Sequence, residues 1–358
     1  MDTAIRIEVL PARLGDCLLV ECPRVGGQTW RMLIDGGPDD TWPVLESRLN
    51  RMDQSDQRFD VVVITHIDSD HIGGIIPFLQ SSYANNVDDF WFNGRTHLPD
   101  VQTRSVTEGE SVVAALLGEA HGKELPWNVA FAGGPIDTGP EAGFLEVPYP
   151  DGPLVTVISP TTKRLSSLAA KWFETLDAAK RGLAEEEEPD VLNPLDDLTA
   201  IADESTPKDA SVSNGSSIAF LIEHRGASVV LGADAFGNVL GAGLAGVASA
   251  RGLERLDVDA FKLPHHGSKR NVIEALVKAA PARHYVVSSN GDTFHHPDDA
   301  ALARVVLNAP SDSTLWFNYR NPRTQRWADA GLCNRYGYST AFPINSSDGI
   351  VLELKAKP

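Results

Sequence analysis

The feature that most constrains this chain is an apolar strand followed at once by a cluster of ionisable residues. Val61-Val62-Val63-Ile64 is a continuous β-branched run, typical of a strand buried on both faces. Polar residues begin at Thr65, and the next segment, His66-Ile67-Asp68-Ser69-Asp70-His71, holds two histidines and two aspartates. Ligands commonly lie on loops that follow the carboxyl ends of such strands. The pattern predicts a metal site on an α/β scaffold.

The spacing of these four residues suits two metal ions. Side chains at positions i, i+2, i+4 and i+5 can direct alternating groups at one ion and the adjacent pair at a second. Gly73-Gly74 is expected to let the backbone bend sharply and to bring the next helix close. The competing interpretation makes His66 a strand cap and the aspartates turn formers. It requires the clustering to arise by chance.

The rest of the chain alternates strands with helices. We expect strands at residues 5–9, 18–22, 31–34, 90–92, 154–158, 218–222, 228–231, 260–263, 284–287, 314–317 and 350–354. We expect helices at 112–120, 271–279 and 297–307, and one that Thr41 caps and that runs to about Met52. Arg225-Gly226 has the signature of a hairpin turn. Two halves of strands with interspersed helices predict two sheets packed together with helices outside.

Composition places the chain among folded globular proteins. It has 358 residues, of which 42% are hydrophobic and 22% charged. The first residues carry charge where a secretory signal is apolar, and no apolar run approaches the roughly 20 residues that cross a bilayer. Three cysteines (Cys17, Cys22 and Cys333) make no disulfide framework. We therefore expect a cytoplasmic protein with no membrane partner.

The charge is acidic and uneven. The net charge of −18 argues against a protein that coats nucleic acid, which would be basic. Residues 174–209 hold 12 acidic and 3 basic residues, so this segment supplies half of the excess. It lies within residues 162–211, which differ from the rest in composition and are interpreted as a peripheral helix and a mobile loop. The solvated segment could also contact a protein partner.

His66-x-Asp68-x-Asp70-His71-x-Gly73-Gly74 resembles the metal-binding signature of the metallo-β-lactamase superfamily, and most closely that of ComEC-type hydrolase domains of the DNA-uptake channel. Segments in family order carry the resemblance further: 14–17, 33–37, 214–217, 231–234, 261–268 and 296–297. It implies the αβ/βα four-layer sandwich, with two mixed β-sheets face to face and helices outside. Residues 1–358 would form one domain, with 162–211 as an acidic insertion.

The resemblance also implies roles, residue by residue. The implied metal ligands are His66 and Asp68 for a first ion, Asp70 and His71 for a second, Asp234 as the bridge, and one of His265 and His266. His266 is favoured for the second ion, because the ligand histidine directly precedes glycine in many relatives. Asp35 would support the ligand loop, and Asp70 would accept a proton from the attacking water.

Substrate contacts are implied for four further residues. They are Ser268, Lys269, Asn290 and His296, the last of which we also expect to be catalytic; the histidine of the 265–266 pair that does not bind metal would join them. A turn with a helix-opening proline is the alternative interpretation of the segment around His296.

The departures from the superfamily pattern concern the first metal. Asp68 stands where a histidine is usual, and residues 213–216 lack the histidine of the third motif. His224 lies further along and is interpreted as a surface turn residue. Carboxylate in place of imidazole moves preference from zinc towards manganese or magnesium. We expect one or two divalent ions, Zn²⁺ or Mn²⁺, with Mg²⁺ possible.

These features predict a divalent-metal-dependent hydrolase, most simply a phosphodiesterase or nuclease that uses a metal-bound hydroxide. The chain's acidity favours single-stranded DNA, nucleotides or another small phosphodiester over duplex DNA. One alternative is hydrolysis of a small ester or lactone, as in a phosphorylcholine esterase, because the fold does not fix the substrate. Another is an effector subunit that the acidic segment gates. A basic rim from Lys262, Lys269, Arg270 and Arg320 would favour nucleic acid.

Overall fold

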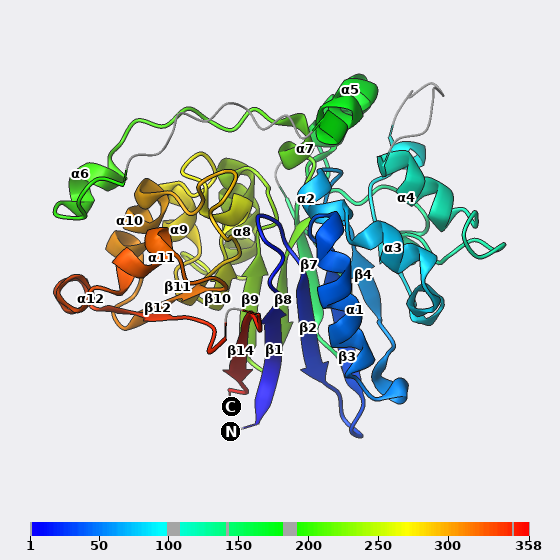
Figure 1. Ribbon diagram of the computed structural model, residues 1–358, viewed down its shortest axis with the longest axis horizontal. Coiled ribbons are helices and arrows are strands. Elements are labelled where there is room, and N and C mark those ends of the chain that lie inside the picture. The colour runs from blue at the N-terminus through cyan, green and yellow to red at the C-terminus, as the bar shows by residue number, and fades with distance from the viewer. Residues whose placement is uncertain (1, 99–107, 141–142, 182–191, 346, 358) are drawn as a thin grey trace.

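The computed structural model describes residues 2–98, 108–140, 143–181, 192–345 and 347–357 (Figure 1). Its strands form two mixed sheets. The six-stranded sheet has the order β14 (Ile350–Lys355), β1 (Thr3–Val9), β2 (Leu18–Pro23), β3 (Thr29–Ile34), β4 (Val61–Val63), β5 (Phe90–Trp91). The eight-stranded sheet has the order β13 (Tyr338–Ala341), β12 (Ser313–Phe317), β11 (Ala282–Val287), β10 (Val258–Lys262), β9 (Ala227–Leu231), β8 (Ala219–His224), β7 (Leu154–Ser159), β6 (Leu145–Pro148).

The helices cover the outer faces of both sheets (Figure 1). Beside the six-stranded sheet lie α1 (Trp42–Asn50), α2 (Ser69–Ile72), α3 (Ile75–Gln80), α4 (Glu108–Leu116), α5 (Thr162–Arg181) and α7 (Val212–Gly215). Beside the eight-stranded sheet lie α6 (Leu198–Ala202), α8 (Gly237–Ala250), α9 (Glu274–Ala279), α10 (Asp299–Asn308), α11 (Pro322–Gln325) and α12 (Ala330–Tyr336).

Strand alternation explains why the core has three parts. In β4, Val61 and Val63 point into the layer between the sheets, while Val62 points towards the helices, and all three are fully buried. Residues of both sheets meet in the middle layer, among them Val20 from β2 and Phe220 from β8. The fold is therefore a four-layer sandwich of helices, two mixed sheets and helices, as predicted.

Two of the local predictions need correction. The side chain of Thr41 does not cap α1; it lies in a preceding turn of 3₁₀ helix, and Pro43 in the first turn of α1 instead favours the start of the helix. The helix α8 was not predicted, because four glycines among its 14 residues lower helix propensity. Tertiary packing outweighs that cost: a Cβ on Gly237 would lie 2.0 Å from the carbonyl oxygen of Asn271.

The predicted insertion, residues 162–211, is partly described. Its first part is α5, whose Leu165, Leu168 and Trp172 are buried among the helices beside the six-stranded sheet. Its last part includes α6, which packs on α10 beside the other sheet. The Glu185–Glu188 run lies outside the described residues. The interpretation of 162–211 as an insertion in a single domain stays a prediction. Within the described residues no helix is both long and apolar enough to span a bilayer.

Candidate metal centre

The predicted ligands meet where strands of both sheets end. Asp35 follows β3, His66 and the short helix α2 follow β4, Asp234 follows β9, and the 265–266 pair follows β10. Figure 1 shows α2 at the upper end of the sheets, where these carboxyl ends lie together. Loops that are far apart in the sequence thus converge on one place.

Glycines let these loops approach one another. A Cβ on Gly74 would lie 2.1 Å from the carbonyl oxygen of Gly36, and one on Gly15 would lie 1.7 Å from that of Asp70. Gly73 and Gly74 have ordinary helical backbone angles, so the predicted sharp bend does not occur. Glycine is needed at these positions because the loop after β3 packs directly against them. The N–H of Gly36 donates to the carbonyl oxygen of His71 at 2.9 Å, which fixes the loop after β3 against the ligand loop.

Each of the four histidines donates through Nδ1 to an oxygen. His71 donates to Asp35 Oδ2 at 2.7 Å, and His266 donates to the carbonyl oxygen of Ser288 at 2.8 Å. His66 donates at 2.9 Å to Oγ1 of Thr65, whose own hydrogen goes to Asp35.

His265 donates at 2.9 Å to Oδ1 of Asn271, whose amide group is used in three donor contacts of its own. Because all four Nδ1 atoms are used as donors, Nε2 is the nitrogen that each ring can offer to a metal.

The four Nε2 atoms converge on Asp234. Its Oδ2 lies 3.4 Å from His71, 3.8 Å from His265 and 3.9 Å from His66, and its Oδ1 lies 3.6 Å from His266. In His66, His71 and His266 this nitrogen is buried and has no hydrogen-bond partner within the described part of the chain, and the same holds for Asp234 Oδ1. Buried polar atoms rarely stay unpaired, so the arrangement fits a cation among them.

Among the described residues, four compact groups could hold an ion; two include Asp16, and the other two consist of predicted metal ligands alone. One is Asp70, His71 and His266; the other is His66, His71 and Asp234, and in each the ligand atoms lie within 4.8 Å of one another. The group of Asp70, His71 and His266 corresponds to the second ion, for which His266 was the histidine favoured from sequence. Asp68 lies 3.4 Å from His66 Nε2 at the edge of the cluster, with 28% of its side chain exposed.

The buried carboxylates raise the pKa values of two histidines in the cluster. Burial disfavours the charged form of His71, but Asp234, Asp70 and Asp35 outweigh it and raise the pKa of His71 well above its ordinary value. Burial likewise opposes protonation of His266, yet Asp234 and Asp16 raise its pKa to about 9. Without a metal, protons on the histidines therefore balance the carboxylates. A divalent cation would displace these protons, so binding should release them.

The backbone at the site is strained. Asp35, Ala233, His265 and His266 all have positive φ angles, between 44° and 55°, a region that side chains other than glycine rarely adopt. Such conformations cost free energy and persist where the surrounding structure imposes them, commonly at functional sites. In the 265–266 pair they turn two adjacent side chains towards the same carboxylate.

Sequence reasoning missed a buried ion pair behind the site. Lys262 and Asp16 are each 2% exposed and form a short ion pair, and Asp16 Oδ1 lies 3.5 Å from His266 Nδ1. The signal was present, since both residues lie in segments that carry the family resemblance, but Lys262 was considered only as one of four cations that could form a basic rim. Asp209 was also missed. Its Oδ2 accepts from the amide of Asn271 at 2.9 Å and thereby supports the partner of His265.

Residues 10–86 match the family model described as "Metallo-beta-lactamase superfamily". The match supports that superfamily. No curated protein matches the chain.

Solved structures that resemble it over most of its length include Zn²⁺-bound PqqB from Methylobacterium extorquens (10% identity, TM-score 0.43, 98% of this chain and 100% of that one). Others are a diphosphatase of the PhnP family (14%, 0.39, 98% and 98%) and a long-form RNase Z from yeast (11%, 0.36, 96% and 44%). At these scores the likenesses carry no information on function.

Of the substrate residues that the resemblance implies, His296 lies beside a predicted metal ligand. Its ring centroid lies 5.1 Å from that of His265. His296 is 1% exposed and neither ring nitrogen has a hydrogen-bond partner among the described residues. Ser268 is fully buried, Lys269 forms an ion pair with Glu204, and the amide of Asn290 donates to Asp292.

The rim cations considered from sequence are largely engaged elsewhere. Lys262 is buried against Asp16, Lys269 pairs with Glu204 at 3.1 Å, and the guanidinium of Arg320 lies 4.0 Å from the ring centroid of Phe342. These three side chains do not form the free basic rim that a long nucleic acid would need. His224, expected on the surface, is only 7% exposed and bonds the carbonyl oxygen of Pro23, away from the metal ligands.

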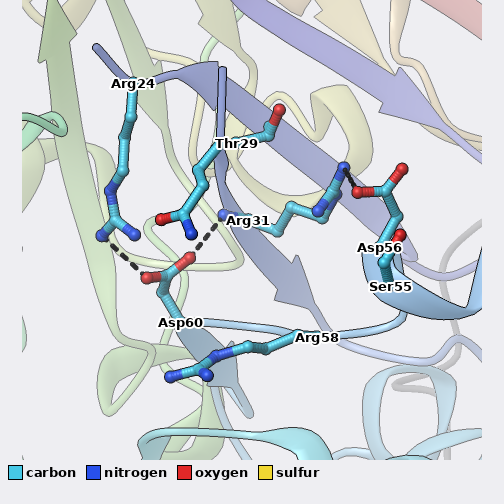
Figure 2. A pocket seen from close by; sticks show the side chains of 8 residues that line it. Arg24, Thr29, Arg31, Ser55, Asp56, Arg58 and Asp60 are labelled. Atoms are coloured by element: carbon cyan, nitrogen blue, oxygen red, sulfur yellow. Dashed lines mark hydrogen bonds and ion pairs between the residues drawn. The ribbon is translucent and has the colours of Figure 1, made fainter. Parts of the chain in front are cut away.

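A basic pocket lies at the other end of the six-stranded sheet. Figure 2 shows Arg24, Arg31 and Arg58 around Asp60, beside the β2–β3 turn and the start of β4. Arg24 pairs with Asp60 at 2.8 Å, Arg31 with Asp56 at 3.1 Å and Arg58 with Asp88. Because the metal ligands follow the carboxyl ends of β3 and β4, this pocket is remote from them. Its cations are already matched by carboxylates.

Proposed function

We propose that this protein is a divalent-metal-dependent hydrolase that cleaves small phosphodiesters, such as nucleotides or short single strands. The observation that carries the proposal is the convergence of four histidine Nε2 atoms on the buried carboxylate of Asp234, with every Nδ1 held by an oxygen acceptor. Histidines fixed in this way are the recurring design of protein metal sites.

The donor set supports hydrolysis. Bound divalent ions lower the pKa of water towards about 7 and neutralise charge that develops on a phosphoryl oxygen. Asp234 could serve two ions, because its Oδ2 faces His66, predicted for the first ion, and its Oδ1 faces His266, favoured for the second. Asp70 is 14% exposed at its side chain and lies between His71 and His266, so it can take a proton from the attacking water.

His296 is suited to contact the substrate without adding charge. Burial and the neighbouring His265 and His266 lower the pKa of His296 well below its ordinary value, so its ring is neutral. A neutral imidazole whose two nitrogens have no hydrogen-bond partner among the described residues, Asp298 Oδ2 lying 3.6 Å from Nδ1, can donate one hydrogen bond and accept another. This supports the prediction that His296 holds a substrate oxygen. Asp35 does not contact the substrate in this proposal; it orients His71 through the hydrogen bond from Nδ1.

Three observations bear on the finer assignment. The engaged rim cations and the net charge of −18 favour a small substrate over duplex DNA. The mixture of imidazole and carboxylate ligands suits Zn²⁺ or Mn²⁺. A ComEC-type activity, here on short single-stranded DNA, remains part of the proposal. So does a cytoplasmic location, which the three free cysteine thiols support.

An activity panel tests the proposal. The protein is assayed with Mn²⁺, Mg²⁺ or Zn²⁺ against single- and double-stranded DNA, RNA and bis(p-nitrophenyl) phosphate, with a lactone and a p-nitrophenyl ester as further substrates. We expect metal-dependent cleavage of the phosphodiester and of short single strands, and loss of that cleavage in Asp70→Asn. No phosphodiester cleavage with any metal would refute the substrate class, and ester cleavage alone would assign the small-molecule alternative.

A further inference from the structure

The first metal site lacks a donor that the resemblance would supply. The region of the missing third-motif histidine is α7, where Ser213 and Asn214 are buried and no histidine occurs. His224 bonds Pro23 and does not reach the cluster. The residues assigned so far to the first ion are His66, Asp68 and Asp234, and of these His66 alone provides a nitrogen donor.

His265 has the features that the other three histidines share. Its Nδ1 donates to an oxygen acceptor, its Nε2 faces Asp234 Oδ2, and the 3.8 Å separation matches the 3.9 Å of His66 from the same oxygen. His266 faces the other oxygen, Asp234 Oδ1, and Asp70. Adjacent left-handed backbone angles aim the two neighbouring rings at different oxygens of one carboxylate.

The support behind His265 comes from the end of the acidic segment. Asp209, whose side chain is 5% exposed, accepts from the amides of both Asn214 and Asn271, so the oxygen of Asn271 is left to accept from His265. Buried Arg304 holds this part of the chain in place. It donates to the carbonyl oxygens of Ala202 and Glu204 on one side and to that of Lys269 on the other.

We propose that both histidines of the pair bind metal, one at each site, and that His265 replaces the missing histidine of the first site. The inference rests on the proposed metal-dependent function. The first set is His66, Asp68, Asp234 and His265, and the second is Asp70, His71, Asp234 and His266.

Asp68 and His265 are the more exposed ligands, at 28% and 20% of their side chains, and belong to none of the four compact groups. They therefore close the first site from its solvent side, and this site binds its ion more weakly than the second. Asp209 is a positioning residue that acts through Asn271.

Metal content measures the proposal without reference to activity. Each variant is dialysed against Mn²⁺ or Zn²⁺, and bound metal is counted by mass spectrometry. Wild type should hold about two ions per chain, and His265→Ala and His266→Ala about one each. His121→Ala is the matched control, because its ring bonds the carbonyl oxygen of Leu79 outside the cluster, and it should keep both ions.

Double variants assign each histidine to its site. Adding Asp68→Ala to His265→Ala should remove no further ion, because both changes affect the first site. Adding Asp70→Ala to His265→Ala should remove the second ion as well. Asp209→Ala should weaken the weaker site by about tenfold or more and leave the stronger one unchanged, the usual effect of removing a partner behind a ligand. Thermal unfolding of the metal-free proteins checks that each variant folds.

The outcomes separate this inference from the proposed function. If His265→Ala keeps two ions, His265 contacts substrate and does not bind metal, and the inference is wrong while the hydrolase stands. If wild type holds one ion that His265→Ala retains, the first site does not form and the inference is again wrong. If wild type binds no metal at all, the proposed function itself fails.

Discussion

Replacing Asp35 by asparagine tests the tautomer argument at the heart of the site. Asp35 is fully buried and accepts three hydrogen bonds, from the N–H of Thr65 at 2.8 Å, from its Oγ1 at 2.7 Å and from His71 Nδ1 at 2.7 Å. Asparagine has almost the same shape, but one of its two acceptor positions becomes an N–H₂ donor. Whichever way the amide turns, a donor then meets a donor.

The magnitude follows from these contacts. With the amide towards His71, Nδ1 must accept, the hydrogen moves to Nε2, and the metal-binding lone pair is lost. Partners behind metal-binding histidines are worth 10- to 100-fold in metal affinity, or roughly 1.4 to 2.7 kcal/mol. With the amide towards Thr65, the metal-free fold loses a hydrogen bond to a charged group, about 1.5 to 3 kcal/mol.

Isothermal titration with Mn²⁺ or Zn²⁺, paired with urea unfolding of the metal-free protein, measures both effects. Asp40→Asn is the control on the same loop, since Asp40 is exposed and its ion pair with Arg13 is a surface contact. We expect Asp35→Asn to lose at least tenfold in metal affinity or about 1.5 to 3 kcal/mol in the free energy of unfolding, according to how the amide turns, and the control to match wild type. Wild-type metal affinity together with wild-type stability in Asp35→Asn would refute the assignment of His71 as a ligand fixed by Asp35.

Three further predictions use other parts of the molecule. Lys262→Met should lower the free energy of unfolding, measured with urea, by about 3 to 5 kcal/mol, because it leaves Asp16 buried without its lysine partner. The control Lys278→Met removes an exposed ion pair and should change this free energy by less than about 1 kcal/mol. Equal effects of the two substitutions would contradict the buried ion pair. Glu8→Gln should cost about 2 kcal/mol at pH 7. Burial raises the pKa of Glu8, but Arg48 and Arg6 lower it below its ordinary value of 4.5. This stabilisation is complete above that value and is lost as the pH falls through the lower pKa of the folded state; a difference between variant and wild type that does not shrink as the pH is lowered below 4.5 would contradict this. Chelation with EDTA should lower the melting temperature reversibly, with Mn²⁺ or Zn²⁺ restoring it, and an unchanged melting temperature would speak against a bound ion.

Much of the architecture could be predicted because local patterns agree with the global fold. The β-branched run at β4 is buried on both faces, and the Arg225-Gly226 turn has positive φ at both residues, as its hairpin signature requires. What failed was local reasoning that tertiary packing overrides. Helix α8 forms in spite of its glycines, because Gly237 and Gly243 lie against the backbone of neighbouring segments.

The ligand cluster was predictable in outline, while its support was not. A strand end followed by alternating histidines and aspartates places ligands near one another from sequence alone. The partners that fix each ring come from distant positions: Asn271 and Asp209 for His265, and the carbonyl oxygen of Ser288 for His266. No spacing rule gives these contacts, because loops of two different sheets must first be brought together. The same reason explains why the partner of Lys262 was missed: Asp16 comes from a loop of the other sheet.

Anomalous diffraction from crystals grown with Mn²⁺ would test the central claim most directly. Two ions with Asp234 between them are expected, one beside Asp70, His71 and His266 and the other beside His66, Asp68 and His265. A single ion, or ions bound away from Asp234, would contradict the account of a two-metal centre.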